Sequence, residues 1–429
     1  MLDRSVAPET QSFGRLTLPD CEVTVLPNGL TLHLLTGGEQ DVARLSIITD
    51  GGPSDISRSD AASICAKLLC EGSKSLDGAA MADLIDFNGA WLSGTASGHF
   101  TTLRLSALTS KFDAVLAPVI DSFVNPAFER DAFEALRQKA AASRRMDTTK
   151  VSWLASTDNL ALICGPSHPD AQYMPADEIE RLTRDDIIKF HGLITEPRNI
   201  HAYLAGKLSD ELIDTVAGRL GGIPSQGLVS PVKIIPYSPE EPCRRTVARA
   251  GALQSAVVMS LPSIKRDHPD YNALRMTVTA LGGYFGSRLM LNVREDKGLT
   301  YGISAALCGS REGAYVVVSS QCDNSFVGKV IDEVKSEIRH MADQPLTTDE
   351  LTRLRANVSS DLASTLDSPF TMIDHYQIER LVGTPSDYFE RRQQTLASLS
   401  PELICEMARK YLDVDRLRIS VAGDTDKIC

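Results

Sequence analysis

The chain lacks several features that would place it in a class at once. No apolar run reaches the roughly 18–20 residues that a membrane-spanning helix needs. The start, MLDRSVAPETQSFGRL, has no basic residues followed by an apolar stretch, so we expect no secretory signal. The nine cysteines are odd in number and include no C-x-x-C pair, which indicates reduced thiols in a cytoplasmic protein.

Positive charge is scarce relative to negative charge. The 44 lysines and arginines stand against 56 acidic residues, which gives a net charge of −12 at pH 7. Nucleic acids and anionic membranes would both repel such a surface, so we expect neither as a partner. The 43% hydrophobic and 23% charged content is typical of a globular protein, and the length of 429 residues predicts two or more domains.

One pattern occurs in both halves of the chain. An apolar strand at residues 42–52 precedes a helix at residues 59–72, and a strand at residues 255–263 precedes a helix at residues 269–283. Each half then shows an alternating strand pair, long helices and a last strand that ends in glycine. The last strands cover residues 199–206 and 416–423. This order predicts an α+β fold of two homologous domains, each a mostly antiparallel sheet with helices packed on it, related by internal duplication.

A linker separates the two halves. The stretch GGIPSQGLVSPVKIIPYSPEEP repeats proline, glycine and serine, which continue neither a helix nor a sheet ladder. We therefore predict an N-terminal domain at residues 1–220, a linker at residues 221–243 and a C-terminal domain at residues 244–429.

The first helical stretch, AASICAKLLCEGS, brings three small or basic side chains together. Its apolar residues follow helical spacing, and we expect Ser59 to cap the helix and Gly72 to end it. On such a helix Ser63, Ala66 and Lys67 share one face. That geometry suits two metal ligands and a base, but these residue types supply neither.

In position and context this stretch resembles the inverted zinc motif H-x-x-E-H of the pitrilysin- and insulinase-like metallopeptidases. Three further segments are similar to family segments in family order, so the resemblance covers nearly the whole chain. They are DFNGAWLSGTASGHFTTLRLSAL, DSFVNPAF and CGPSHPDAQYMPADEIERLTRDDIIKFHGLITEPRN. Within the family the chain resembles the non-zinc partner subunit of two-subunit bacterial peptidases and of the mitochondrial processing peptidase.

The resemblance implies a zinc site that this chain has lost. In zinc-bearing members two histidines bind the metal, one glutamate activates a water, and a glutamate on a later helix completes the ligand set. Here the motif positions hold Ser63, a poor ligand, Ala66, which cannot act as a base, and Lys67, a cation without an acceptor. The later helix offers Ala142, Ser143, Arg144 and Arg145 at the last position. We therefore expect no metal or other cofactor in this chain, and zinc in a partner subunit.

A second motif is intact. The stretch LNVREDKGLTYGIS resembles the arginine and tyrosine with which the family holds substrate at the zinc, here Arg294 and Tyr301. Arginine keeps its charge and the tyrosine hydroxyl donates a hydrogen bond, so the pair suits a substrate carbonyl or a developing oxyanion. A surface arginine and a half-buried strand tyrosine are the alternative. The flanking GGYFGSRL and GLTYG also match the family block, which favours a functional pair.

The glycine-rich piece at residues 281–289 allows two interpretations. It follows a helix and contains neither G-x-G-x-x-G nor G-x-x-x-x-G-K, which excludes a nucleotide-binding loop. Its position resembles the longer glycine-rich loop in the non-zinc subunit of the mitochondrial processing peptidase, which implies substrate binding by Gly282, Gly283 and Gly286. Tight termination of the preceding helix explains the glycines equally well.

Other reactive side chains give no site. We interpret His375 and Glu379, spaced i, i+4, as a solvated helix face. Cys65 and Cys70 flank the lost zinc motif, but no general base lies near them in sequence, so we interpret Cys65 as a small buried hydrophobe and reject cysteine catalysis.

Together these features predict the non-catalytic subunit of a two-chain zinc peptidase that cleaves short or unfolded peptides. The partner would be a homologous zinc-bearing subunit, and the peptide would lie along the strand near residues 90–95, as family members bind extended chains. Whether the chain is itself an enzyme stays open, and a homodimer is also compatible with the sequence. A family-derived scaffold or peptide-binding protein, and an autonomous peptidase with an unrecognised metal site, are the alternatives.

Overall fold

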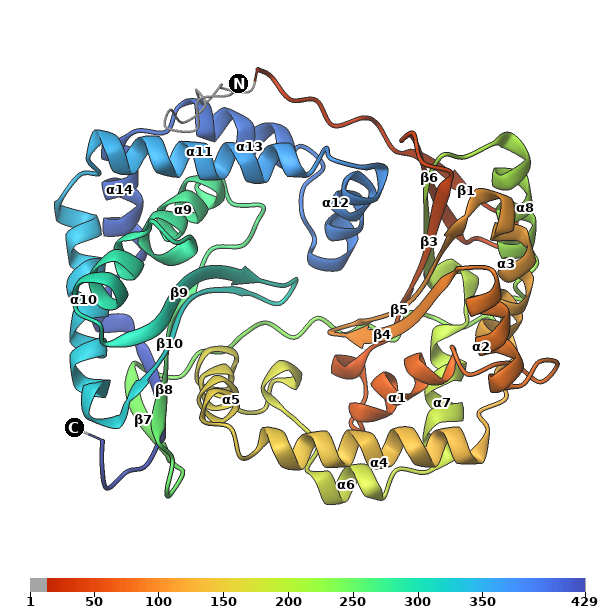
Figure 1. Cartoon of the computed structure of the whole chain (residues 1–429), viewed down its shortest axis with the longest axis horizontal. Coiled ribbons are helices and arrows are strands. Elements are labelled where there is room, and N and C mark those ends of the chain that lie inside the picture. Colours follow the sequence, from red (N-terminus) through yellow and green to blue (C-terminus); the bar gives the residue numbers. More distant parts are fainter. Residues whose placement is uncertain (1–13, 429) are drawn as a thin grey trace, which may run out of the picture.

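A computed structural model describes residues 14–428 and shows two units of sheet and helices side by side (Figure 1). The first sheet belongs to the N-terminal half of the chain. In spatial order its strands are β1 (Glu22–Val25), β2 (Thr31–Thr36), β6 (Ile200–Gly206), β3 (Val42–Asp50), β5 (Phe100–Leu108) and β4 (Trp91–Ser97). All neighbouring strands are antiparallel except β2 and β6, which run parallel.

The second sheet repeats the first without a counterpart of β1. Its strands are, in spatial order, β7 (Cys243–Ala248), β11 (Arg418–Gly423), β8 (Gln254–Ser263), β10 (Ala314–Asp323) and β9 (Thr300–Gly309). Again one pair, β7 and β11, is parallel and the other pairs are antiparallel. The predicted α+β class is therefore confirmed, and the duplication seen in the sequence corresponds to one strand order used twice.

Helices of the N-terminal half cover one face of the first sheet. They are α1 (Asp60–Leu68), α2 (Gly78–Phe87), α3 (Thr109–Val124), α4 (Arg130–Asp147), α6 (Ala176–Glu180), α7 (Arg184–Ile194) and α8 (Asp210–Gly221). Side-chain caps start several of them. The Asp77 carboxylate accepts from Ala80 N at the start of α2, and Thr183 and Asp186 cap α7 reciprocally.

The C-terminal half supplies most of the helices around the second sheet and one helix that packs on the first. They are α9 (Tyr271–Val278), α10 (Val327–Asp343), α11 (Thr348–Ser364), α12 (Pro369–Val382), α13 (Tyr388–Ala397) and α14 (Pro401–Tyr411). After α9 the chain forms two wider, π-helical segments, η4 (Thr279–Gly283) and η5 (Met290–Asp296), which lead into β9.

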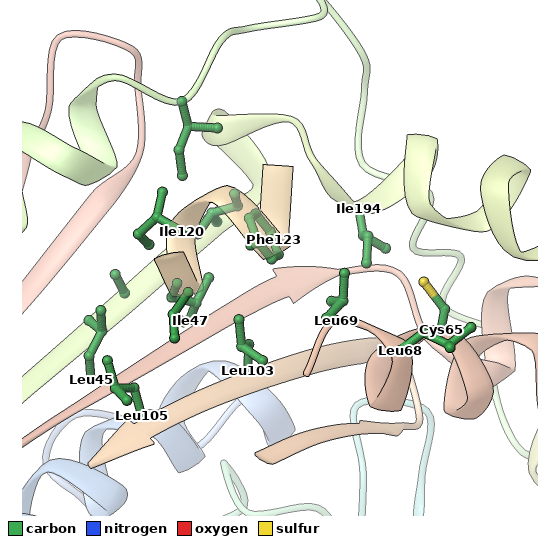
Figure 2. Packing of buried hydrophobic residues seen from close by; sticks show 14 of the residues in the cluster. Leu45, Ile47, Cys65, Leu68, Leu69, Leu103, Leu105, Ile120, Phe123 and Ile194 are labelled. Carbon is green, nitrogen blue, oxygen red and sulfur yellow. The ribbon is translucent and has the colours of Figure 1, made fainter. Parts of the chain in front are cut away.

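The largest core of the N-terminal half lies between the first sheet and the helices of the same half (Figure 2). Leu45 of β3 and Leu103 of β5 point from the sheet, and Ile120 and Phe123 of α3 meet them from the helix layer. Phe123 is almost fully buried, which is worth about 1.5–3 kcal/mol relative to an exposed side chain. Every second residue of the strands and residues three or four positions apart on the helices thus form one continuous apolar layer.

Two helices cross from one half to the other. Helix α5 (Val151–Cys164) comes from the N-terminal half but packs on β8 and β11, where Ala155 contacts the second sheet. Conversely, α12 from the C-terminal half packs on β2 and β6, and Ile373 is fully buried against the first sheet. Each sheet is therefore covered on its second face by a helix that belongs, in sequence, to the other half.

Two extended segments also join the halves. Near the N-terminus, Leu16 exchanges two hydrogen bonds with the Gln393 side chain of α13, and Tyr376 of α12 donates to Pro19 O before the chain reaches β1. Residues 224–241 carry no helix or strand. They are nevertheless tied down, because the N–H groups of Ser238 and Glu240 donate to the end of α5 and the Glu196 carboxylate accepts from residues at the start of the segment.

A buried ionic bridge forms a further link. His99, between β4 and β5, contacts Asp55 Oδ1 at 2.7 Å through Nδ1 and the Glu312 carboxylate through Nε2. Glu312 lies between β9 and β10 in the other half. Burial alone would lower the pKa of His99, but the hydrogen bonds to the two carboxylates raise it to about 10, so the ring carries a proton.

Two sequence expectations at α1 are wrong. Ser59 precedes the helix, but its backbone is already helical and its side chain makes no capping hydrogen bond. The helix ends at Leu68, and Gly72, with φ of +94°, stands four residues later, where the chain leaves a turn. Between residues 14 and 428, no helix has the length and apolar content to cross a membrane.

Candidate functional site

The three positions that correspond to the zinc motif lie on α1, next to the edge strand β4. Ser63 is half-buried, Ala66 is fully buried and Lys67 is exposed. The backbone of β4 lies so close to the helix that a Cβ added to Gly94 would stand 1.7 Å from Ala66 O. A hydroxyl, a methyl group and an ammonium group at these places provide no base and no set of metal ligands.

An ion pair joins α1 and α4 near the positions that correspond to the zinc motif. Among the four residues predicted at the last ligand position, Ala142, Ser143 and Arg145 are exposed and only Arg144 turns toward α1. Its Nη2 lies 3.3 Å from Asp60 Oδ1, its Nη1 donates to Met174 O, and its guanidinium lies over the Tyr173 ring. Burial raises the pKa of Asp60, while Arg144 acts to lower it.

No alternative chemistry is present at this position. Among residues 14–428, no group of three or more His, Cys, Asp or Glu side chains is arranged to hold a metal ion. Burial raises the pKa of the Cys70 thiol to about 12 and raises the pKa of Cys65 further, so neither is a thiolate at neutral pH. The described residues therefore provide no set of zinc ligands at these positions.

Arg294 and Tyr301 lie on adjacent elements of the second half. Arg294 is in η5, where its guanidinium stands over the Phe285 ring at 5.0 Å and 3.1 Å from the Glu295 carboxylate. The chain turns at Gly298, with φ of +60°, and enters β9, where Tyr301 is 89% exposed. The half-buried tyrosine of the structural alternative is therefore wrong. Arg294 is half-buried, Tyr301 is exposed, and no hydrogen bond joins the two side chains.

Sequence reasoning missed Phe285, which is 62% exposed and holds Arg294 by a cation–π contact. The aromatic residue between the glycines of GGYFGSRL was the available signal. Of those glycines, Gly282 is buried, and an added Cβ would stand 2.6 Å from Ala305 Cβ, so close packing on β9 accounts for it. Gly283 is exposed and Gly286 is half-buried, and substrate binding by the three glycines stays a prediction.

The expected solvated face at His375 and Glu379 is also wrong. His375 is half-buried against the Tyr388 and Phe389 rings, and burial raises the pKa of the Glu379 carboxyl. Fold and site together thus define the class of protein: a duplicated α+β protein in which the positions that correspond to the zinc motif carry no metal ligands.

Comparison with known proteins agrees with this class. Residues 181–358 match the family model described as the peptidase M16 inactive domain. An uncharacterized zinc protease of Streptomyces coelicolor is 25% identical over 255 residues, which span 58% of this chain and only 55% of that protein. The non-peptidase homolog YmxG of Helicobacter pylori is 23% identical over 92% of this chain and 91% of its own length.

Solved structures show the same fold. The peptidase M16 inactive domain from Pseudomonas fluorescens superimposes with a TM-score of 0.87 at 22% identity and covers 96% of this chain and 100% of its own. The periplasmic protease PqqL from Escherichia coli gives a TM-score of 0.78 at 16% identity, with 98% of this chain but 47% of that chain covered. The predicted resemblance is confirmed: the chain is similar to M16-type proteins, and residues 181–358 match the inactive domain of that family.

Proposed function

We propose that this chain is the non-catalytic subunit of a two-chain zinc peptidase and presents Arg294 and Tyr301 to the active site of its partner. The observation that carries this proposal is the 89% exposure of Tyr301 beside an arginine held in place by Phe285 and Glu295. A tyrosine so exposed contributes little to the stability of its own domain, whereas it is accessible to a second chain.

The two side chains have complementary tasks in this proposal. Zinc in the partner would activate the attacking water. From this chain, the Arg294 guanidinium and the Tyr301 hydroxyl would donate hydrogen bonds to the scissile carbonyl oxygen as it gains negative charge. Contact with Phe285 reduces the freedom of the Arg294 side chain, so less entropy is lost when the donor is used.

The likeness to PqqL and the residues at the zinc positions support a homologous partner. This chain matches 47% of PqqL, and its zinc positions hold Ser63, Ala66 and Lys67, so in our proposal the metal ligands come from a second, homologous unit. We expect this partner to be a homologous chain with H-x-x-E-H. A homodimer would bring two copies of the same vacant positions together and would not cleave peptides.

Short or unfolded peptides are the substrates that the sheet edge favours. Strand β4 is the last strand of the first sheet and, among the strands of residues 14–428, pairs with β5 alone, so we expect the backbone groups of its other edge to accept an added strand. A folded substrate would have to expose a separate extended segment to use this edge.

The test combines isolation and kinetics. The tagged chain is purified from its own cells, co-purifying chains are identified by mass spectrometry, and the mixed complex is assayed for zinc-dependent peptide cleavage. We expect Arg294→Ala and Tyr301→Phe each to lower kcat/KM by about 10²–10³ with assembly unchanged. Arg339→Ala, on the exposed side of α10, is the matched control.

Two outcomes would contradict the proposal. Full cleavage by an assembled complex that carries Arg294→Ala would remove the role of the pair. Recovery of the chain alone, inactive and without zinc, would favour the scaffold or peptide-binding protein instead. A cytoplasmic location is likewise still a prediction, and fractionation of the same cells tests it.

A further inference from the structure

A cavity of about 220 Å³ lies between α9, α11, α12 and α13 and shares no lining residue with α1, η5 or β9. Three arginines from separate segments line it. Arg266 precedes α9, Arg275 is in α9 and Arg392 is in α13. The same wall carries the Tyr388 hydroxyl and the hydroxyl of Thr371.

The arginines outnumber the carboxylates that can neutralise them. Arg275 and Arg392 share Asp361, with Arg392 Nη2 in direct contact and Arg275 Nη2 at 3.7 Å. The other acid in the lining, Asp374, forms an ion pair with Arg44 of β3, whose Nη2 lies 2.5 Å from Asp374 Oδ1. Three guanidinium groups thus face one carboxylate that is not already held from outside the cavity.

Arg266 has no carboxylate partner within the described residues. Its Nη1 donates to Thr384 Oγ1 at 3.4 Å, its guanidinium lies over the Tyr271 and Tyr388 rings, and its Nε is buried without a partner. A cation on two aromatic faces tolerates partial desolvation, but its charge stays uncompensated.

Burial makes the Arg392 charge costly, although at Arg275 the effect of burial is outweighed by contact with Tyr388, which raises the pKa of Arg275. Arg392 is only 9% exposed, and burial together with the Arg275 charge lowers its pKa. Burial and the charges of Arg392 and Arg266 also lower the pKa of His375, against the effect of Glu390, so this ring adds no further charge at neutral pH. A bound anion would relieve the repulsion between the guanidinium groups.

We propose that this cavity is a binding site for a phosphate group, either inorganic phosphate or a small phosphate ester. A phosphate carries about −1.5 to −2 at pH 7, which matches the two guanidinium charges that Asp361 leaves uncompensated. Guanidinium forks fit phosphate oxygens in a bidentate manner. Tyr388 O accepts from Arg275 Nη1 at 2.6 Å, so its own proton is free to be donated to the anion.

Binding is measured on the full chain by isothermal titration calorimetry and by ³¹P NMR line broadening, at constant ionic strength. The probes are inorganic phosphate and glycerol 3-phosphate, which separate the free ion from an ester, and acetate serves as the singly charged comparison. We expect saturable binding of at least one phosphate probe and weaker or no binding of acetate.

The decisive variant is Arg266→Gln, because it removes one cavity charge without separating the Arg392 and Asp361 pair. We expect its affinity to fall by about 10- to 100-fold with unchanged unfolding behaviour. Arg339→Gln and Arg294→Gln should bind like the wild type, since neither residue lines the cavity. Absence of saturable phosphate binding, or equal affinity in Arg266→Gln, would overturn the proposal and leave the proposed peptidase role untouched.

Discussion

Replacement of His99 by glutamine should remove a pH-dependent link between the two halves. The protonated ring lies between Asp55 and Glu312, and all three side chains are at most 8% exposed. Glutamine keeps hydrogen-bonding capacity but no charge, so two carboxylates stay buried without a cation. Loss of one partner of a buried ionic pair typically lowers the free energy of unfolding by about 3–5 kcal/mol. We expect a loss of that size at pH 6.

The pH dependence follows from the two pKa shifts. The pKa of His99 is raised from 6.5 to about 10, so its stabilisation is complete below pH 6.5 and is lost as the pH rises toward 10. Burial would raise the pKa of Glu312, but hydrogen bonds from His99 and Ser310 lower it to about 2, so its stabilisation is lost as the pH falls from 4.5 through 2. The bridge is strongest between about pH 4.5 and pH 6.5.

Between pH 7 and pH 9 the folded state holds a proton on His99 that the unfolded state has released. Stability should therefore decline by about 1.4 kcal/mol per pH unit, and the difference between wild type and His99→Gln should shrink by about 2–3 kcal/mol over this range. Urea unfolding followed by circular dichroism at several pH values measures it, with the partly exposed His340→Gln as control. A difference that stays constant from pH 7 to pH 9 would refute the reasoning.

Three further perturbations test other parts of the structure. Gly94→Ala forces a methyl group against Ala66 O and should lower the free energy of unfolding, measured in urea, by about 1–3 kcal/mol. Gly192→Ala in α7 has open space around the new methyl group and should raise it slightly. Equal effects of the two substitutions would contradict the close approach of β4 to α1. Glu196→Gln should lower the free energy of unfolding by about 1–3 kcal/mol at pH 7, because the hydrogen bonds to the Glu196 carboxylate overcome burial and lower its pKa to about 2. The difference from wild type should shrink as the pH falls from 4.5 toward 2. Residues 1–220 alone lack α12 and should bind a hydrophobic dye; cooperative unfolding of this fragment as a monomer would exclude that expectation.

Features with a local sequence signal could be predicted, and those built from distant segments could not. The alternation of apolar residues and the glycines at strand ends predicted the duplicated α+β order of elements. The residue types at Ser63, Ala66 and Lys67 predicted that these positions hold no metal ligands. The bridge from His99 to Glu312 joins residues 213 positions apart, for which a single sequence holds no signal. The same is true of the cavity lined by Arg266, Arg275 and Arg392, whose other lining residues come mostly from α11, α12 and α13. At Ser59 the residue type favoured a cap, but a preceding turn had already fixed a helical backbone.

The crossing helices explain why a duplicated sequence does not yield two independent units. Each half repeats the same strand order, yet the second face of each sheet is covered by α5 or α12 from the other half. An apolar face left without its helix would be exposed to water, so the halves fix each other's orientation. A subunit that presents side chains to a partner's active site requires this rigidity, because an error of about 1 Å in a donor position can cost about 10²-fold in rate. If the proposed role of Arg294 and Tyr301 is correct, the exchange of helices provides the fixed frame that it requires.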